Sequence, residues 1–193
     1  VKGLIDIVVI RTPRISNFTD FNAFEQFEGV GVRYVKSPKD VGDPDMIIIP
    51  GTKSTMGDLK WLRETGIETR IQKHASKGKP VFGICGGYQM LGQYLKDEHG
   101  VEGGGEMKGI GLLPHSTEFS ESKTRKSQIG KLAKVDGIFS GLSGMEYEGY
   151  EIHMGISPGF GNIINEGNIY GTYIHGIFDR SDISSEIINS LMT

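Results

Sequence analysis

The stretch VFGICGGYQMLG, residues 81–92, contains the chain's one cysteine, Cys85, between an apolar segment and two glycines. The residues before Cys85 are typical of a buried strand, and those after Gly86 are typical of a helix. A sharp strand-to-helix turn exposes a nucleophile at a sheet edge, beside backbone N–H groups that stabilise an oxyanion. Such a turn is crowded, so it needs small residues at the positions of Gly83 and Gly87. We interpret Cys85 as a nucleophile rather than an inert core thiol.

The segments before this turn alternate between expected strands and expected helices. In chain order they are a strand at 4–10, a helix at 19–29 capped by Thr19 or Asp20, strands at 30–37 and 45–50, helices at 55–66 and 67–77, and a strand at 81–85. This alternation predicts an α/β fold of three layers, with a central, mostly parallel sheet and helices on both faces. Ligands bind beyond the carboxyl ends of strands in such folds, which directs attention to the segments after residues 50 and 85.

The second half of the chain differs from the first in composition and no longer alternates between expected strands and helices. Residues 116–128, STEFSESKTRKSQ, are polar, and we interpret them as a solvated loop. Residues 168–178 predict a strand, and residues 181–191 predict a closing helix capped by Ser181 or Asp182. No linker divides the chain convincingly, so we expect a single domain over residues 1–193.

Composition excludes several classes of function. The 193 residues are 37% hydrophobic and carry a formal net charge of −3, which gives no general attraction for nucleic acid or an anionic membrane surface. A single cysteine excludes an intrachain disulfide and a multi-cysteine zinc site. Neither a membrane-spanning stretch nor a targeting segment is visible. We expect a cytoplasmic protein that acts on a small molecule and holds no metal.

A cysteine nucleophile needs a partner that moves protons, and histidine is the usual one. The chain offers five: His74, His99, His115, His153 and His175. We interpret the first three as surface residues. His175 ends an apolar strand and precedes Gly176, so it is the favoured partner, and His153, on another alternating segment, is the alternative.

The segment PGTKST, residues 50–55, follows an expected strand and superficially resembles a phosphate-binding loop. The required glycine upstream of Lys53 is missing, so it is not one. Two interpretations remain open. Backbone N–H groups of Gly51 or Thr52 contribute to an oxyanion site, or the segment is a plain connection with Ser54 as helix cap.

Four segments together resemble the class I (triad-type) glutamine amidotransferases, and within them the cobyric acid synthase branch, the CobB/CobQ-like family. They are PGTKST (50–55), GICGGYQMLG (83–92), GYEIHMG (149–155) and GTYIHGIF (171–178). The resemblance implies a flavodoxin-like glutaminase fold with Cys85 as nucleophile and His175 as its partner. It also implies that Gly51 and Gly86 donate to the oxyanion and that Gln89 helps to hold the substrate.

One position departs from the family's pattern. The wider class has a glutamate two residues after the catalytic histidine, where this chain has Ile177. What orients His175 is therefore open, with Asp179 or a backbone carbonyl as the alternatives.

The resemblance implies that this domain hydrolyses L-glutamine to glutamate and ammonia through a cysteine thioester, without a cofactor of its own. It further implies an N-terminal synthetase domain that uses ATP and magnesium to amidate carboxylates of a corrin, adenosylcobyrinic a,c-diamide, during cobalamin biosynthesis. Because the chain begins with Val1, we expect that domain upstream. Two alternatives are a glutaminase subunit of a complex that amidates a peptidoglycan lipid precursor, and a catalytically silent docking module, suggested by Ile177.

Overall fold

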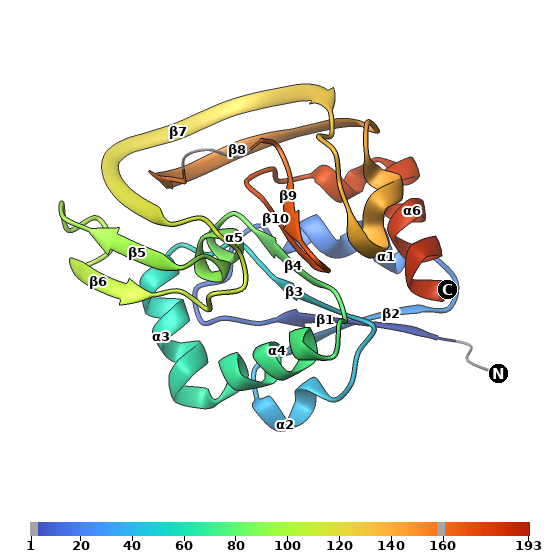
Figure 1. The fold of residues 1–193 in the computed structure, drawn as a ribbon, viewed down its shortest axis with the longest axis horizontal. Helices are drawn as coiled ribbons and strands as arrows, with labels where there is room; N and C mark the ends of the chain where they lie inside the picture. The colour runs from blue at the N-terminus through green and yellow to red at the C-terminus, as the bar shows by residue number, and fades with distance from the viewer. Residues whose placement is uncertain (1–3, 158–160) are drawn as a thin grey trace.

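A six-stranded sheet forms the centre of the computed structural model, which describes residues 4–157 and 161–193 (Figure 1). Its strands are β1 (Ile5–Ile10), β2 (Val30–Val35), β3 (Met46–Ile49), β4 (Val81–Ile84), β9 (Ile164–Glu166) and β10 (Ile169–Thr172). They lie in the order β2-β1-β3-β4-β10-β9, and all neighbouring pairs are parallel except β9 with β10. The mostly parallel central sheet predicted from the sequence is confirmed.

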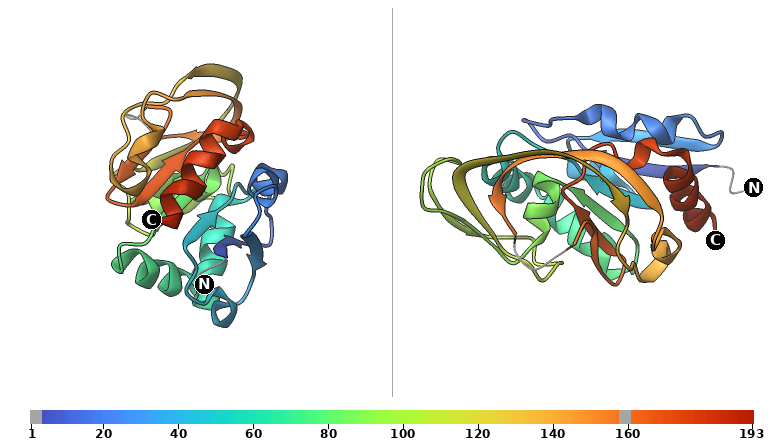
Figure 2. Two further views of the ribbon diagram at one scale, coloured as in Figure 1. Left: turned by 90° about the vertical axis from the view of Figure 1, so that its right-hand side faces the viewer. Right: turned by 90° about the horizontal axis from the view of Figure 1, so that it is seen from above.

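Each face of this sheet carries its own apolar core, because successive side chains of a strand point to opposite faces. In β1, Ile7 and Val9 belong to one core and Val8 and Ile10 to the other. One face is covered by α2 (Pro38–Val41), α3 (Thr55–Thr65), α4 (Ile67–Ser76) and α5 (Gly86–Leu91). The other is covered by η1 (Phe18–Phe21), α1 (Asn22–Glu25), η2 (Gly137–Leu142), η3 (Ile177–Asp179) and α6 (Ser181–Met192). The three layers are confirmed, and Figure 2 shows them from two further sides.

A second sheet, with the order β6-β5-β7-β8, flanks the first. Its strands are β5 (Tyr94–Asp97), β6 (Gly105–Lys108), β7 (Thr117–Lys131) and β8 (Glu146–Ile156). The antiparallel pair of β7 and β8 runs above the central sheet in Figure 1. The interpretation of 116–128 as a loop is wrong, because nearly all of it lies in β7. Most side chains of β7 are exposed, so the strand is held by pairing with β8 and shows no apolar alternation.

Two predicted helix caps are also wrong. The helix expected at 19–29 is the short pair η1 and α1, which ends at Glu25, and Asp20 is buried inside η1 instead of capping it. In α6, Ser181 and Asp182 occupy the first helical positions, with Arg180 as the N-cap residue. By contrast, α3 and α4 begin and end within one residue of their predicted bounds.

Candidate active site

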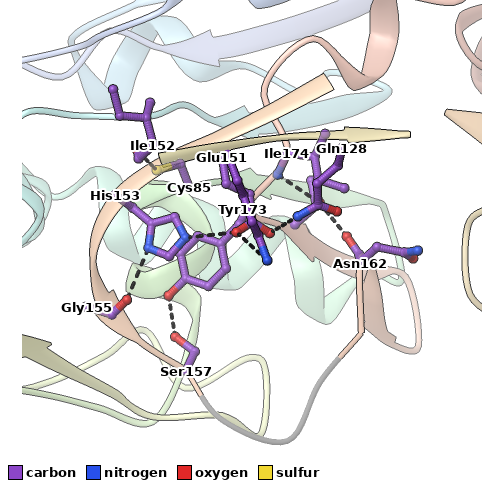
Figure 3. Close-up of polar contacts among 12 residues, drawn as sticks. Cys85, Gln128, Glu151, Ile152, His153, Gly155, Ser157, Asn162, Tyr173 and Ile174 are labelled. Carbon is purple, nitrogen blue, oxygen red and sulfur yellow. Dashed lines mark hydrogen bonds and ion pairs between the residues drawn. The ribbon is translucent and has the colours of Figure 1, made fainter. Parts of the chain in front are cut away.

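Cys85 lies at the tip of a strained turn between β4 and α5. Its backbone has φ 52° and ψ −108°, and residues other than glycine rarely adopt a positive φ. The N–H of Cys85 donates to the carbonyl of Thr172 in β10 (2.8 Å), which holds the turn against the neighbouring strand. Its Sγ lies 3.5 Å from the carbonyl oxygen of Ile152 in β8 (Figure 3). Strain of about 1–3 kcal/mol at one residue is characteristic of functional sites.

The glycines around Cys85 are required by close packing. A Cβ on Gly83 would lie 2.6 Å from Cδ1 of Leu91, and one on Gly87 would overlap the carbonyl oxygen of Ile49. The positions two before and two after Cys85 therefore admit only glycine, as the crowded turn predicts. A Cβ on Gly86 would lie 2.5 Å from Cγ2 of Thr52, so the PGTKST segment packs directly on the start of α5.

His175 follows β10 and is 1% exposed. Its backbone exchanges two hydrogen bonds with Tyr150 of β8, and the rings of these two residues stack with centroids 5.2 Å apart. Nδ1 of His175 lies 2.7 Å from Oδ2 of Asp20. Its Nε2 is buried without a hydrogen-bond partner among the described residues, and so is available to a reacting group. On the other side of the ring, Cε1 faces Gly51, where a Cβ would be 3.0 Å away.

The protonation of His175 is set by its neighbours. Burial acts to lower the pKa of this imidazole, but the hydrogen bond to Asp20 and the interaction with Cys85 raise it to about 9. The ring is therefore cationic at neutral pH. Cys85 is one of the groups that raise this pKa. Both residues also contact β8, Cys85 through Ile152 and His175 through Tyr150, so the two predicted catalytic residues lie against the same strand.

Asp20 orients His175, a role that the sequence interpretation left open between Asp179 and a backbone carbonyl. Besides binding Nδ1, the carboxylate of Asp20 accepts a hydrogen bond from the N–H of Gly176 (3.3 Å). Asp179 is exposed and does not bind the ring. The local sequence predicts Thr19 or Asp20 as a helix cap, and no local pattern links Asp20 to a histidine 155 positions away.

Gln89 lies on α5, one turn after Cys85, and is 2% exposed. Its Oε1 accepts a hydrogen bond from Oγ1 of Thr55 (3.0 Å), and its Nε2 donates to the carbonyl of Met154 (3.0 Å) and to the hydroxyl of Tyr173 (3.2 Å). Gln89 thus ties α5 to α3, β8 and the segment after β10. It also lines the cavity that contains Cys85.

His153 packs on the other side of that cavity. Its ring stacks on Tyr173 with centroids 3.7 Å apart, and its nitrogens contact the carbonyl of Gly155 (3.1 Å) and the carboxylate of Glu151 (3.4 Å) (Figure 3). Burial lowers its pKa, although Glu151 acts in the opposite direction. Both nitrogens are engaged, which favours a structural role for this alternative histidine.

The remaining histidines differ in burial from what was expected. The sequence predicts His74 and His115 as surface residues, but they are 5% and 2% exposed. Nε2 of His74 pairs with the carbonyl of Pro80, and Nε2 of His115 pairs with that of Tyr88, both at 2.9 Å. These interpretations are wrong, because a backbone carbonyl satisfies a buried imidazole without any signal in the sequence. His99 lies in an exposed turn, as expected.

The PGTKST segment is held over the start of α3. Oγ1 of Thr52 donates to the buried carboxylate of Asp58 (2.5 Å) and accepts from the N–H of Ser54 (3.0 Å). Ser54 is the N-cap residue of α3, but its side chain does not make the capping hydrogen bond. The amide nitrogen of Thr52 lies beside Gly86, 3.3 Å from where a Cβ would be, whereas Gly51 lies against His175.

A cavity of about 400 Å³ opens onto Cys85, within the roughly 300–1,000 Å³ typical of small-molecule sites. Its wall is formed by Ser16, Asn17, Thr52, Lys53, Thr55, Cys85, Gln89, Glu102, Phe119, Lys123, Ile152, His153 and Met154. The wall combines apolar surface with a few charged groups. Such a site fits a polar metabolite of amino-acid size.

Within residues 4–157 and 161–193, no cluster of three or more His, Cys, Asp or Glu side chains has an arrangement that would hold a metal ion. In the same ranges, no helix combines the length and apolar composition needed to cross a bilayer.

Comparison with known proteins gives a consistent picture. Residues 6–183 match the model of the CobB/CobQ-like glutamine amidotransferase domain. The chain is 56% identical to a cobyric acid synthase of Ruminiclostridium cellulolyticum and 51% identical to one of Lachnoclostridium phytofermentans, over 98% and 97% of its length. It spans only 41% and 42% of those relatives' own lengths.

Solved structures share the fold. PurLQS from Thermotoga maritima aligns with a TM-score of 0.68 at 22% identity, covering 97% of this chain and 99% of that one. A structure described as a glutamine amidotransferase aligns with a TM-score of 0.70 at 17% identity, with the same coverage of 97% and 99%.

Proposed function

The chain belongs to the CobB/CobQ-like glutamine amidotransferase family, and we propose that it is the glutamine-hydrolysing domain of an enzyme that makes cobyric acid. The observation that carries this proposal is the set Asp20, His175 and Cys85. A buried carboxylate binds a cationic imidazole, whose pKa depends on a cysteine at a strained turn beside a cavity. That is the arrangement expected for cysteine-based acyl transfer.

In the first half of the proposed reaction, the Cys85 thiolate attacks the side-chain amide carbon of L-glutamine. A C–S bond forms and the carbonyl oxygen becomes an oxyanion. His175 then gives its Nε2 proton to the departing nitrogen, the C–N bond breaks, and ammonia leaves a γ-glutamyl thioester. Asp20 keeps the ring oriented and stabilises its charge.

In the second half, water attacks the thioester. His175, now neutral, takes a proton from that water, the C–S bond breaks, and glutamate leaves with the Cys85 thiolate restored. The same imidazole thus acts once as acid and once as base.

We assign the oxyanion to backbone N–H groups of Gly86 and of the Gly51–Thr52 peptide segment. The start of α5 lies beside Thr52, and the positive end of a helix favours negative charge. In this proposal Gln89 helps to shape the glutamine site from the cavity wall, with both ends of its amide fixed by the protein.

Ammonia is useful to such an enzyme only beside an acceptor. The matched relatives are more than twice as long as this chain, which supports a further domain in the same enzyme. We propose that this domain precedes residues 1–193, binds ATP and magnesium, and activates corrin carboxylates of adenosylcobyrinic a,c-diamide. We expect the enzyme to act in the cytoplasm, where ATP is available.

Both alternatives are less well supported. The silent docking module rested on Ile177 in place of an acid, and Asp20 supplies that acid from another part of the chain. The peptidoglycan alternative has no support from the relatives described above, which are cobyric acid synthases.

Labelling with an electrophilic glutamine analogue, read by mass spectrometry of the intact protein, tests the proposal. We expect a single adduct on Cys85, and glutamine hydrolysis that increases when the ATP-dependent domain and its corrin substrate are added. A protein that stays unlabelled with those components present would be a silent module. Amidation of a lipid precursor instead of the corrin would support the peptidoglycan alternative.

A further inference from the structure

The cavity beside Cys85 carries charges that the reaction at the amide group does not use. Its wall contains one carboxylate, Glu102, and two lysines, Lys53 and Lys123. Neither lysine forms an ion pair with any residue that the structure describes. A free amino acid carries one ammonium and one carboxylate at its α-carbon, so these charges complement its head group.

Glu102 is held in a fixed position. The buried carboxylate of Asp97 accepts hydrogen bonds from the N–H groups of Val101 (3.0 Å), Glu102 (2.6 Å) and Gly104 (2.8 Å), which folds this loop around Asp97. Oε1 of Glu102 then accepts a hydrogen bond from the N–H of Met56 (2.8 Å), in the first turn of α3. The loop around Asp97 fixes the backbone of Glu102, and the first turn of α3 fixes its carboxylate at the cavity wall.

A chain of contacts connects Glu102 to Cys85. Met56 follows Thr55, whose Oγ1 binds Gln89 and lies 3.1 Å from where a Cβ on Gly86 would be. Gly86 is the residue after Cys85. Cys85 and Glu102 line the same cavity, which thus presents a nucleophile for the amide end of a substrate and a carboxylate for its charged end.

Lys123 lines the cavity from β7. It pairs in register with Met154 across β7 and β8, and the carbonyl of Met154 accepts the hydrogen bond from Gln89. Lys53 comes from the PGTKST segment, two residues before α3. The lysines therefore line the cavity from two different elements, and Glu102 is bound to the first turn of α3.

We propose that Glu102 binds the α-ammonium group of the substrate glutamine and that Lys53 and Lys123 receive its α-carboxylate. This assignment rests on the proposed glutaminase function and names the residues that select a free amino acid over other amides.

Two amides missing one charged group each test the assignment. Glutarate monoamide lacks the α-ammonium group, and 4-aminobutanamide lacks the α-carboxylate. With the unaltered protein, assayed alone and with its ATP-dependent partner domain, we expect kcat/KM to fall roughly 10- to 100-fold for each, the effect of one lost charged hydrogen bond. Equal kcat/KM for L-glutamine and glutarate monoamide would overturn the role of Glu102.

The variant Glu102→Gln keeps an oxygen for the N–H of Met56 but removes the charge. We expect it to lose activity on L-glutamine through KM and to lose its preference for L-glutamine over glutarate monoamide, with unchanged thermal unfolding. Glu98→Gln, on the exposed surface nearby, is the matched control and should keep that preference. Retention of the full preference in Glu102→Gln would refute the assignment.

Lys53→Gln and Lys123→Gln test the carboxylate end in the same way, against 4-aminobutanamide, with the exposed Lys134→Gln as control. Loss of discrimination in either variant supports the assignment, and retention in the double variant contradicts it. Failure of the proposed function itself would look different, because the unaltered protein would then neither hydrolyse L-glutamine nor be labelled at Cys85.

Discussion

Nδ1 of His175 and Oδ2 of Asp20 lie 2.7 Å apart, although 155 positions separate the two residues in the sequence. Both side chains are buried, Asp20 in η1 and His175 after β10. Because one ring nitrogen is fixed by the carboxylate, the other faces the reacting group in a single orientation. Asp20, near the start of the sequence, thus supplies the acid that is absent at Ile177.

Replacement of Asp20 by asparagine is expected to lower kcat for glutamine hydrolysis by roughly 100-fold or more, with a small effect on KM. The amide keeps the shape of the carboxylate but removes the charge that stabilises the imidazolium. Steady-state ammonia release measures the first effect. We also expect the pKa of His175 to be lower than in the unaltered protein, which NMR titration of the ring measures.

Asp179→Asn is the matched control for that experiment. Asp179 is exposed, and in the described part of the chain the ring nitrogen Nδ1 is bound by Asp20 and not by Asp179, so activity and the pKa of His175 should change little. A larger loss in Asp179→Asn than in Asp20→Asn would reverse the two assignments.

The pKa of His175 should also depend on Cys85. Burial lowers it, whereas Asp20 and Cys85 together raise it to about 9. In Cys85→Ser, one of the two raising interactions is lost, so we expect the ring to titrate at a lower pH than in the unaltered protein. Two-dimensional NMR of the imidazole measures this directly. An unchanged titration midpoint would mean that the ring does not face the sulfur.

The raised pKa of His175 also predicts how stability varies with pH. The folded value is about 9 and the ordinary value is 6.5, so the folded protein holds the proton more tightly. The resulting stabilisation, on the order of 3 kcal/mol, is complete below pH 6.5 and is lost as pH rises through 9. Urea unfolding at several pH values should show this loss. A His175→Gln variant should show a flatter dependence over that range.

The parts of this site that depend on local spacing can be predicted from the sequence. The strand before Cys85 and the glycines at 83 and 87 are neighbours in the chain, so their crowding is visible as a pattern. Asp20 is different, because its partner lies across the fold, and a buried aspartate in a short polar segment has the same local signature as a helix cap. A single sequence does not show which distant residues pair, as Asp20 and His175 do.

The polar composition of β7 predicts a loop for a related physical reason. Strand prediction relies on one face being buried, but β7 is exposed along most of its length, and its hydrogen bonds go to β8. Its polar composition therefore resembles that of a loop. The central strands lie between two apolar cores, and for them composition alone was sufficient.

His153 is expected to be dispensable for chemistry. Its ring stacks on Tyr173, and its nitrogens contact Gly155 and Glu151, so substitution removes packing but no proton transfer. In His153→Gln we expect Cys85 to react with the electrophilic glutamine analogue at close to the unaltered rate, with stability lower by about 1 kcal/mol. In His175→Gln the reaction should be nearly abolished. The reverse order would make His153 the catalytic partner.

The turn at Cys85 should tolerate no side chain at Gly87. A Cβ there would overlap the carbonyl oxygen of Ile49, a backbone atom of β3 that cannot move without disturbing the sheet. We therefore expect Gly87→Ala to destabilise the fold by roughly 2 kcal/mol or more, measured by thermal or urea unfolding. Gly31→Ala in β2 is the matched control, since its nearest neighbour would be an ordinary 3.9 Å away, and it should unfold like the unaltered protein. Equal stability of the two variants would mean that α5 does not pack on β3 as closely as the turn requires.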